Sequence, residues 1–360
     1  SFAIVVSPVN DAPVLDLNGA GVGLETSVDY LEGAAAVLVA PAATITDVDS
    51  ADFAGGLLNI GFDVADPDGQ LGIRNEGTGA GQIGVSGDTV TYGGVTIGTL
   101  GGGGTLPGPG GNLVIFLDAA ASVAATEALV RNITYSNGSE APTGGSRSIS
   151  FTLGDGDGNT NGGASSTTTL ATVVVTPVND APELVINAGL TVDEGATGSP
   201  IDATALATTD VDNTDAELTY ILDSVPANGT LYRRGIALGV SDTFTQADVA
   251  AGLITYDHDG SETLSDGFDF SVSDGLETIG GQSFAITINP VTPVNEPPVL
   301  AVNDGSTVNE GAVGSQIDAT ALATTDVDNT DAELTYTLGS APANGTLYRS
   351  GIALGVSDTF

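Results

Sequence analysis

The sequence predicts an all-β protein in which β-sandwich domains follow one another in a linear array. Residues 191–244 return almost unchanged at residues 307–360, with 47 of 54 positions identical at an offset of 116. A period of this length indicates tandem domains. Short apolar segments with a period of two alternate with Gly, Asn, Asp and Pro, which is the pattern of strands joined by turns.

Three proline-containing linkers mark the predicted boundaries between units. They run from Pro8 to Pro13, from Pro177 to Pro182 and from Pro293 to Pro298. Proline stiffens a connector and lacks the amide hydrogen that would continue a sheet ladder. The predicted parts are the last strand of a preceding domain at 1–9, a first unit at 10–178, a second unit at 179–294 and a truncated third unit at 295–360. We expect the chain to continue beyond both ends of this sequence.

The second unit has the clearest pattern of elements. Strands are expected near residues 184–187, 217–222, 229–233, 253–256, 267–273 and 283–289. A short helical turn is expected at 246–250, where Thr245 can cap the start, Asp248 lies at the third helical position and Gly252 can end the turn. Many short strands in a unit slightly longer than 100 residues favour a β-sandwich.

The first unit follows the same plan with an insertion. The spacing from Asp47 to Tyr135 is 88 residues, whereas the matching spacing from Asp210 to Tyr256 is 46, so 42 residues are additional. They lie at about 60–112, are rich in glycine and contain an apolar alternation that predicts an added hairpin. We interpret the insertion as a surface excursion, with a lateral contact surface as the alternative.

The charge of the chain restricts its function. Six basic residues stand against 46 acidic ones, which gives a formal net charge of −40. Such a polyanion repels itself and repels phosphate backbones, so nucleic-acid binding of the usual basic kind is excluded. No stretch of about 18 apolar residues is present, so this segment is not expected to span a membrane. The chain therefore needs cations, either as diffuse counterions or as bound ions.

The acidic residues recur where a hard cation would be bound. Asp210 and Asp212 are two residues apart, which places both carboxylates on one face of an extended segment. Other acids follow strands or precede glycines, as Glu194 and Asp274 do. Calcium takes six to eight oxygen ligands from carboxylates, amides, carbonyls and water. Repetition of the pattern favours calcium sites, whereas a single Asp-x-Asp would be read as a turn.

Together these motifs resemble a known family. The segments at 256–263 (Tyr-Asp-His-Asp-Gly-Ser-Glu-Thr) and 270–275 (Phe-Ser-Val-Ser-Asp-Gly), with Glu-Gly, Asp-x-Asp and the Asn-Asp-Ala-Pro linker, resemble cadherin-like repeats with an immunoglobulin-like (Ig-like) sandwich fold. The resemblance is greatest to the repeats of chondroitin sulfate proteoglycans and of giant bacterial surface adhesins. It covers the second and third units well and the first unit in outline.

The resemblance implies calcium between consecutive units, held by the lower unit, the linker and the upper unit. At the start of the first unit the implied ligands are Asn10, Asp11, Asp47, Asp49 and Asp155. Between the first and second units they are Glu32, Asn179, Asp180, Asp210, Asp212 and Asp274. Between the second and third units they are Glu194, Asp257, Asp259, Asn295, Glu296, Asp326 and Asp328. The first unit has Ser136 and Asn137 in place of Asp257 and Asp259, which predicts fewer or weaker ions at its upper junction.

These features predict a structural protein rather than an enzyme. We expect a calcium-stiffened extracellular segment of a large surface adhesin or filament that mediates adhesion between cells, to surfaces or within a biofilm matrix. Its expected partners are calcium ions, adjacent repeats and either other copies in a filament or a surface glycan or protein. A glycan- or protein-binding module is the alternative, favoured only by Tyr92 and Phe116. No catalytic residues are predicted, because the single histidine, His258, lacks a nucleophile partner and repeated acids suit repeated ion sites better than one active site.

Overall fold

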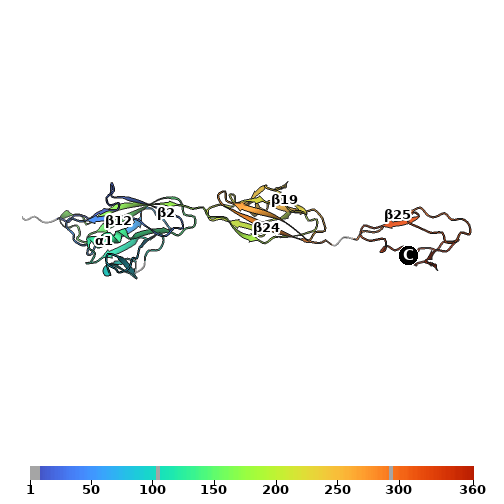
Figure 1. The fold of residues 1–360 in the computed structure, drawn as a ribbon, viewed down its shortest axis with the longest axis horizontal. Coiled ribbons are helices and arrows are strands. Elements are labelled where there is room, and N and C mark those ends of the chain that lie inside the picture. Colours follow the sequence, from blue (N-terminus) through green and yellow to red (C-terminus); the bar gives the residue numbers. More distant parts are fainter. Residues whose placement is uncertain (1–8, 103–105, 292–294) are drawn as a thin grey trace, which may run out of the picture.

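The computed structural model describes residues 9–102, 106–291 and 295–360. Strands and their connections make up most of this part of the chain, which confirms the all-β prediction. The three units follow one another along one line (Figure 1). The strand predicted at the start of the chain lies outside the described residues.

The first unit contains two larger sheets, one two-stranded sheet formed by its first and fourth strands, and one α-helix. Its strands are β1 (Val14–Asp16), β2 (Thr26–Leu31), β3 (Val37–Leu38), β4 (Thr44–Thr46), β5 (Leu57–Phe62), β6 (Gly69–Ile73), β7 (Ile83–Ser86), β8 (Thr89–Tyr92), β9 (Val95–Leu100), β10 (Leu113–Leu117), β11 (Ile133–Asn137), β12 (Gly145–Gly154) and β13 (Ser166–Thr176). Helix α1 (Val123–Arg131) precedes β11, and a 3-10 turn (Thr160–Gly162) precedes β13. The larger sheet has the order β2-β13-β12-β5-β10-β9-β8-β7, and the smaller one β3-β11-β6.

The second unit repeats this architecture in a shorter form. Its elements are β14 (Glu183–Asn187), β15 (Leu190–Asp193), β16 (Ser199–Pro200), β17 (Leu206–Thr209), β18 (Thr219–Leu222), β19 (Gly229–Arg233), β20 (Ile236–Ala237), β21 (Thr243–Thr245), α2 (Gln246–Ala250), β22 (Ile254–His258), β23 (Ser265–Ser273) and β24 (Thr278–Asn289). Its two larger sheets run β15-β24-β23-β18-β21 and β16-β22-β19-β20, and β14 and β17 form a third, two-stranded sheet. In both units an early strand pairs in parallel with the last strand, since β2 joins β13 and β15 joins β24.

Each of these two units has its own hydrophobic core. The first core extends from Leu15 to Val175 and the second from Val192 to Ile288, and no residue belongs to both. Aromatic rings fill their centres, as with Tyr30 against Tyr135 at 5.3 Å. Fully burying such a side chain contributes roughly 1.5–3 kcal/mol. Because each core is separate, each of these units packs around its own apolar residues. The exact boundaries between the units stay predictions.

The helical turn at 246–250 is confirmed together with its capping box. Thr245 accepts from the amide of Asp248 at 3.2 Å, and the Asp248 carboxylate accepts from the amide of Thr245 at 3.0 Å. The sequence did not predict α1, which occupies the same place in the first unit. Ser122 caps α1 by accepting the amide of Ala125 at 3.2 Å.

The additional strands of the first unit are β7, β8 and β9. Strands β8 and β9 form a hairpin, which confirms the added hairpin predicted from the apolar alternation. Strands β5 and β6 have counterparts in β18 and β19, because β5 pairs with β12 as β18 does with β23, and β6 pairs with β11 as β19 does with β22. The predicted start of the insertion, near residue 60, therefore falls within the common fold.

The third unit repeats the first half of the second. Its strands are β25 (Val299–Asn303), β26 (Leu322–Thr325), β27 (Tyr348–Arg349) and β28 (Ile352–Ala353). The β25–β26 pair has the same register shift as β14–β17. Tyr336 stacks on Phe360 at 5.3 Å as Tyr220 stacks on Phe244 at 4.8 Å. None of the seven positions that differ between the copies is buried in the second unit, so the same core residues produce the same local fold.

Candidate metal centres at the unit junctions

The linker between the first and second units is attached to the Asp-x-Asp loop of the second unit. The amide of Asp180 donates to Oδ2 of Asp212 at 2.9 Å. The amides of Asp212 and Asn213 both donate to Oδ1 of Asp210, at 2.8 and 3.0 Å. Oδ2 of Asp210 and Oδ1 of Asn213 are buried and have no hydrogen-bond partner. Local turn chemistry thus uses one oxygen of Asp210 and leaves the other available.

Asn179 joins the same linker to the turn that follows β23. Its Nδ2 donates to Oδ2 of Asp274 and to the carbonyl oxygen of Asp180, each at 2.7 Å. The amides of Leu276 and Glu277 donate to Oδ1 of Asp274, each at 2.6 Å. Burial acts to raise the pKa of Asp274, but the bonds from Asn179 and the two amides outweigh it and lower the pKa. Asp274 is therefore held as a carboxylate beside the linker.

Glu32 approaches the linker from the first unit. It follows β2, and its Oε2 accepts from the amide of Val178 at 2.7 Å. Its Oε1 is buried without a partner. Glu32, Glu140 and Asp180 each place a carboxylate oxygen within 4.8 Å of the others, and they form the single group of three such ligands among the described residues. The structure thus brings together two predicted ligands and adds Glu140, which the sequence reasoning missed.

The junction between the second and third units repeats the contact between the linker acid and the Asp-x-Asp loop. The amide of Glu296 donates to Oδ2 of Asp328 at 2.7 Å. The amide of Asp328 donates to Oδ1 of Asp326 at 2.8 Å, and Oδ2 of Asp326 is buried without a partner. Asn295 Nδ2 donates to the Glu296 carbonyl oxygen at 3.3 Å. The linker and upper-unit ligands are therefore arranged as at the first junction.

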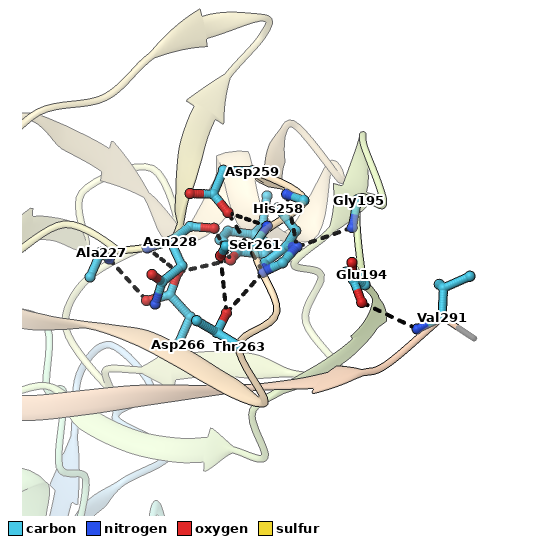
Figure 2. Close-up of polar contacts among 12 residues, drawn as sticks. Glu194, Gly195, Ala227, Asn228, His258, Asp259, Ser261, Thr263, Asp266 and Val291 are labelled. Carbon is cyan, nitrogen blue, oxygen red and sulfur yellow. Dashed lines mark hydrogen bonds and ion pairs between the residues drawn. The ribbon is translucent and has the colours of Figure 1, made fainter. Parts of the chain in front are cut away.

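Glu194 is the counterpart of Glu32. Its Oε2 accepts from the amide of Val291 at 3.3 Å, as Figure 2 shows. The described residues contain no group of three carboxylates at this junction. The sequence Gly-Ser-Glu follows β11 at residues 138–140 and β22 at residues 260–262. Glu262 is therefore the counterpart of Glu140.

Asp257 and Asp259 make local loop contacts on either side of His258. Oδ1 of Asp257 accepts from the amide of Gly198 at 2.6 Å, and Oδ1 of Asp259 accepts from the amide of Ser261 at 2.9 Å. The hydrogen bonds from the side chain and amide of Ser261 lower the pKa of Asp259. The structure does not bring either carboxylate into a group of three with the other predicted ligands of the described chain.

His258 holds the Glu-Gly turn in place. Its Nδ1 accepts from the amides of Gly195 and Gly260 at 3.0 and 3.2 Å, and Nε2 lies 3.1 Å from Oγ1 of Thr263 (Figure 2). Because Nδ1 accepts two hydrogen bonds, the neutral ring carries its proton on Nε2, which donates to Thr263. His258 therefore has a local structural role, because its ring joins the Glu-Gly turn to the loop after β22.

The structure also corrects the alignment of the first unit with the second. Asn137 takes the position of His258 rather than that of Asp259, since the two pair with Gly69 and Gly229 at matching places in β11 and β22. Oδ1 of Asn137 accepts from the amide of Ser139 at 2.9 Å, the bond that Nδ1 of His258 makes to Gly260. The sequence comparison missed this because the loop after β22 is one residue longer.

The start of the first unit has the upper half of the same arrangement. Asn10 Nδ2 donates to Oδ2 of Asp155 at 2.9 Å, and Asp155 is fully buried. The amide of Asp11 donates to Oδ2 of Asp49 at 3.2 Å. Oδ1 of Asp47 accepts from the amide of Asp49 at 3.1 Å, while its Oδ2 is buried without a partner. Desolvation, with the negative charge of Asp47 added, raises the pKa of Asp49.

One atom is left unsatisfied at the same place in every unit. Oδ2 of Asp47, Asp210 and Asp326 is buried without a hydrogen bond, and so is Oε1 of Glu32. A buried polar atom without a partner costs about 1–3 kcal/mol, and more when it is charged. The donor set consists of carboxylate, amide and carbonyl oxygens, which fits a hard cation such as calcium and does not fit a soft transition metal.

Residues 182–288 match a family model described as cadherin-like. The human extracellular matrix organizing protein FRAS1 is 31% identical over 233 residues, which is 60% of this chain and 6% of that protein. Human chondroitin sulfate proteoglycan 4 is 44% identical over 117 residues, which is 32% of this chain and 5% of that protein. The chain thus spans about a twentieth of the length of these relatives.

Among solved structures, a three-repeat fragment of human CDH23 (EC21–23) aligns over 93% of this chain and 87% of its own length, with a TM-score of 0.37 and 15% identity. Of the helices in residues 9–102, 106–291 and 295–360, none is both long and apolar enough to cross a bilayer. The relatives are matrix and proteoglycan proteins, and the chain is an extracellular segment. The motif order, the repeated sandwiches and these matches support cadherin-like repeats of the chondroitin sulfate proteoglycan type, and the family model itself covers the second unit.

Proposed function

We propose that calcium binds between consecutive units of this chain and stiffens it into a rod. Two observations carry the proposal. The same oxygen is unpaired in Asp47, Asp210 and Asp326, and the carboxylates of Glu32, Glu140 and Asp180 form a group of three. A cation would satisfy these oxygens and remove the repulsion between the carboxylates. It would also join three parts of the chain, because the ligands come from the lower unit, the linker and the upper unit.

The domain division supports this role. We propose units at 10–178, 179–294 and 295–360, with one candidate centre at each linker. Each linker supplies an Asn followed by an acid, and the acid's amide is already bound to the second Asp of the Asp-x-Asp loop at 3.2, 2.9 and 2.7 Å in the three units. These contacts support the proposal, because they hold each linker acid beside the Asp-x-Asp loop.

The rod would serve as an extracellular structural element. We propose that it is part of a large surface adhesin or matrix filament that holds cells to one another, to surfaces or to a biofilm matrix. The relatives, which include an extracellular matrix organizing protein, support an adhesive or structural role. We propose no enzymatic reaction, because the same acids recur in successive units at the unit ends and use their oxygens on backbone amides.

A calcium titration of the whole chain tests the proposal. Extracellular calcium modules have dissociation constants of about 10⁻⁴–10⁻³ M. An ion at ten times its dissociation constant stabilises the folded state by about 1.4 kcal/mol. We expect calcium to raise the melting temperature and to make the scattering profile that of a longer, stiffer particle, whereas magnesium at the same concentration does so less.

Two variants make the titration specific to the junction. Asp180→Asn removes a carboxylate of the three-ligand group, and we expect it to weaken the calcium response. Glu183→Gln removes a charge three residues away on exposed β14 and should leave the response unchanged. If the melting curve and the scattering profile of the parent chain are the same in calcium and in excess chelator, the proposal is wrong.

A further inference from the structure

Part of the exposed side of the larger sheet in the first unit has no charged side chains. The register of the strands places nine residues there in two neighbouring rows. We call these two rows the outer face. One row consists of Thr168, Thr152, Asn59 and Val114, and the other of Ser166, Gly154, Leu57, Phe116 and Thr99. The corresponding sheet of the second unit carries the exposed Asp269 on β23. These nine positions carry no charge in a chain whose formal net charge is −40.

Phe116 lies within the second row and is not needed by the core. It is 55% exposed, whereas its neighbours Ile115 and Leu117 point inward and are 0% and 4% exposed. Its cross-strand partners are Leu57 and Thr99. A large aromatic ring on a polar sheet surface gains little from folding and offers a flat apolar contact to a ligand.

A shallow depression lies beside Phe116. Its volume is about 330 Å³, and its lining combines residues of the two rows with loop residues: Leu57, Thr152, Gly154, Ser166, Gly55, Gly56, Gly156, Gly158 and Ser165. Leu57 is the direct cross-strand partner of Phe116, so the depression and the ring are adjacent on the outer face. Small-molecule sites span roughly 300–1,000 Å³, which places this depression at the lower end of the range.

The polar groups of the outer face are hydroxyls and an amide. The hydroxyl oxygens of Thr152 and Thr168 are 2.9 Å apart. Asn59 lies next to Thr152 in the row, and its Oδ1 is buried without a partner. Rotation of this amide toward a bound hydroxyl would remove the unsatisfied oxygen, which costs about 1–3 kcal/mol when left unpaired.

The edge of the larger sheet at β7 has backbone groups that are already hydrogen-bonded, so the face of the sheet is the better candidate for binding than this edge. Strand β7 lies at this edge, and Nδ2 of Asn75 donates to the carbonyl oxygen of Val85 at 2.9 Å. The amide of Glu76 donates to the carbonyl oxygen of Ile83 at 2.7 Å, and the amide of Ile83 donates to the Glu76 carboxylate at 3.3 Å. A partner strand therefore has few open backbone groups to pair with at this edge.

We propose that the outer face of the first unit binds an uncharged oligosaccharide. A sugar ring has an apolar face of C–H groups that can lie on Phe116, and hydroxyls that both donate to and accept from Asn59, Thr152 and Thr168. Acidic glycans are disfavoured, because the rows contain no Arg to pair with a sulfate or carboxylate and the chain is strongly negative. A second copy of this chain is disfavoured by the same repulsion.

The test uses the whole chain and a panel of neutral hexose hexasaccharides, with uronic-acid hexasaccharides as the charged counterparts. Binding is followed by changes in the amide NMR signals of β5, β10 and β12. We expect at least one neutral sugar to bind with saturation, and Phe116→Ala to weaken it about tenfold. Val95→Ala is the matched control, because Val95 is 59% exposed on the added hairpin but outside the two rows.

Several results would overturn the proposal. These are no change in the outer-face signals with any neutral sugar at millimolar concentration, binding by Phe116→Ala equal to the parent, or equally strong binding of the uronic-acid sugars. The melting temperature of Phe116→Ala should match the parent, since the ring is exposed, and this separates lost binding from lost fold. Parent and Phe116→Ala are compared at one fixed calcium concentration, so a difference between them reports on the outer face and not on the junctions.

Discussion

Replacing Glu140 by Gln should change the stability of the chain in opposite directions with and without calcium. Glu140 lies within 4.8 Å of the carboxylate oxygens of Glu32 and Asp180. Two unit charges at this distance repel by roughly 0.9 kcal/mol in bulk water and by about 3.5 kcal/mol at an effective dielectric constant of 20. Glu140 is exposed, so the lower value applies, and a gain of about 1 kcal/mol is expected when its charge is removed.

In chelator and low salt, this gain corresponds to a rise of about 2–4 °C in the melting temperature of a unit of this size. Sodium chloride at 1 M should abolish the rise by screening. In millimolar calcium the same variant should melt below the parent, because the site has lost a charged ligand. Circular dichroism melting curves in the two conditions measure both shifts.

Glu25→Gln is the matched control, since Glu25 is exposed in the loop before β2 and belongs to no carboxylate group found in the described chain. It removes the same charge and should show no reversal of sign. A shift of Glu140→Gln with one sign in both conditions, or equal to that of Glu25→Gln in both, would refute the reasoning.

Three further predictions concern the sandwiches themselves. Burial raises the pKa values of Tyr135 and Tyr220 to about 12. The stability that their neutral form supplies is therefore complete below pH 10 and is lost between pH 10 and 12. Melting curves and tyrosinate absorbance can follow this loss. Phe270→Ala should cost about 3–5 kcal/mol and lower the melting transition of the second unit alone, seen as a separate step in calorimetry. Thr245→Ala removes the cap of α2 and should cost about 1 kcal/mol by urea unfolding, and a change below 0.3 kcal/mol would contradict the assigned contact with Asp248.

The fold was largely readable from the sequence because its strands follow simple periodic patterns. The strands around residues 229–233 and 283–289 have clear apolar alternation and appear as β19 and as part of β24. Very short strands such as β16 carry too few residues to show a period. Helix α1 was missed although Ser122 and the Ala- and Leu-rich segment after it favour a helix, and alignment with α2 would have found it.

The candidate site was readable only in part, because three-dimensional proximity depends on loop lengths. The Asn-acid linkers and the Asp-x-Asp loops recur in the sequence, and the structure joins them by backbone hydrogen bonds in each unit. Glu140 escaped detection because neither it nor its counterpart Glu262 belongs to an Asp-x-Asp, Glu-Gly or linker motif, so no repeated pattern marked either residue as a ligand. The unpaired oxygens of the aspartates depend on burial, which no local pattern reports.

A crystal structure of the chain grown in millimolar Ca²⁺ tests the calcium account most directly. The account predicts anomalous metal density between the carboxylates of Glu32, Glu140 and Asp180, with an ion also bound by Oδ2 of Asp210. Well-ordered carboxylates that face separate water molecules there, with no metal between them, would contradict it.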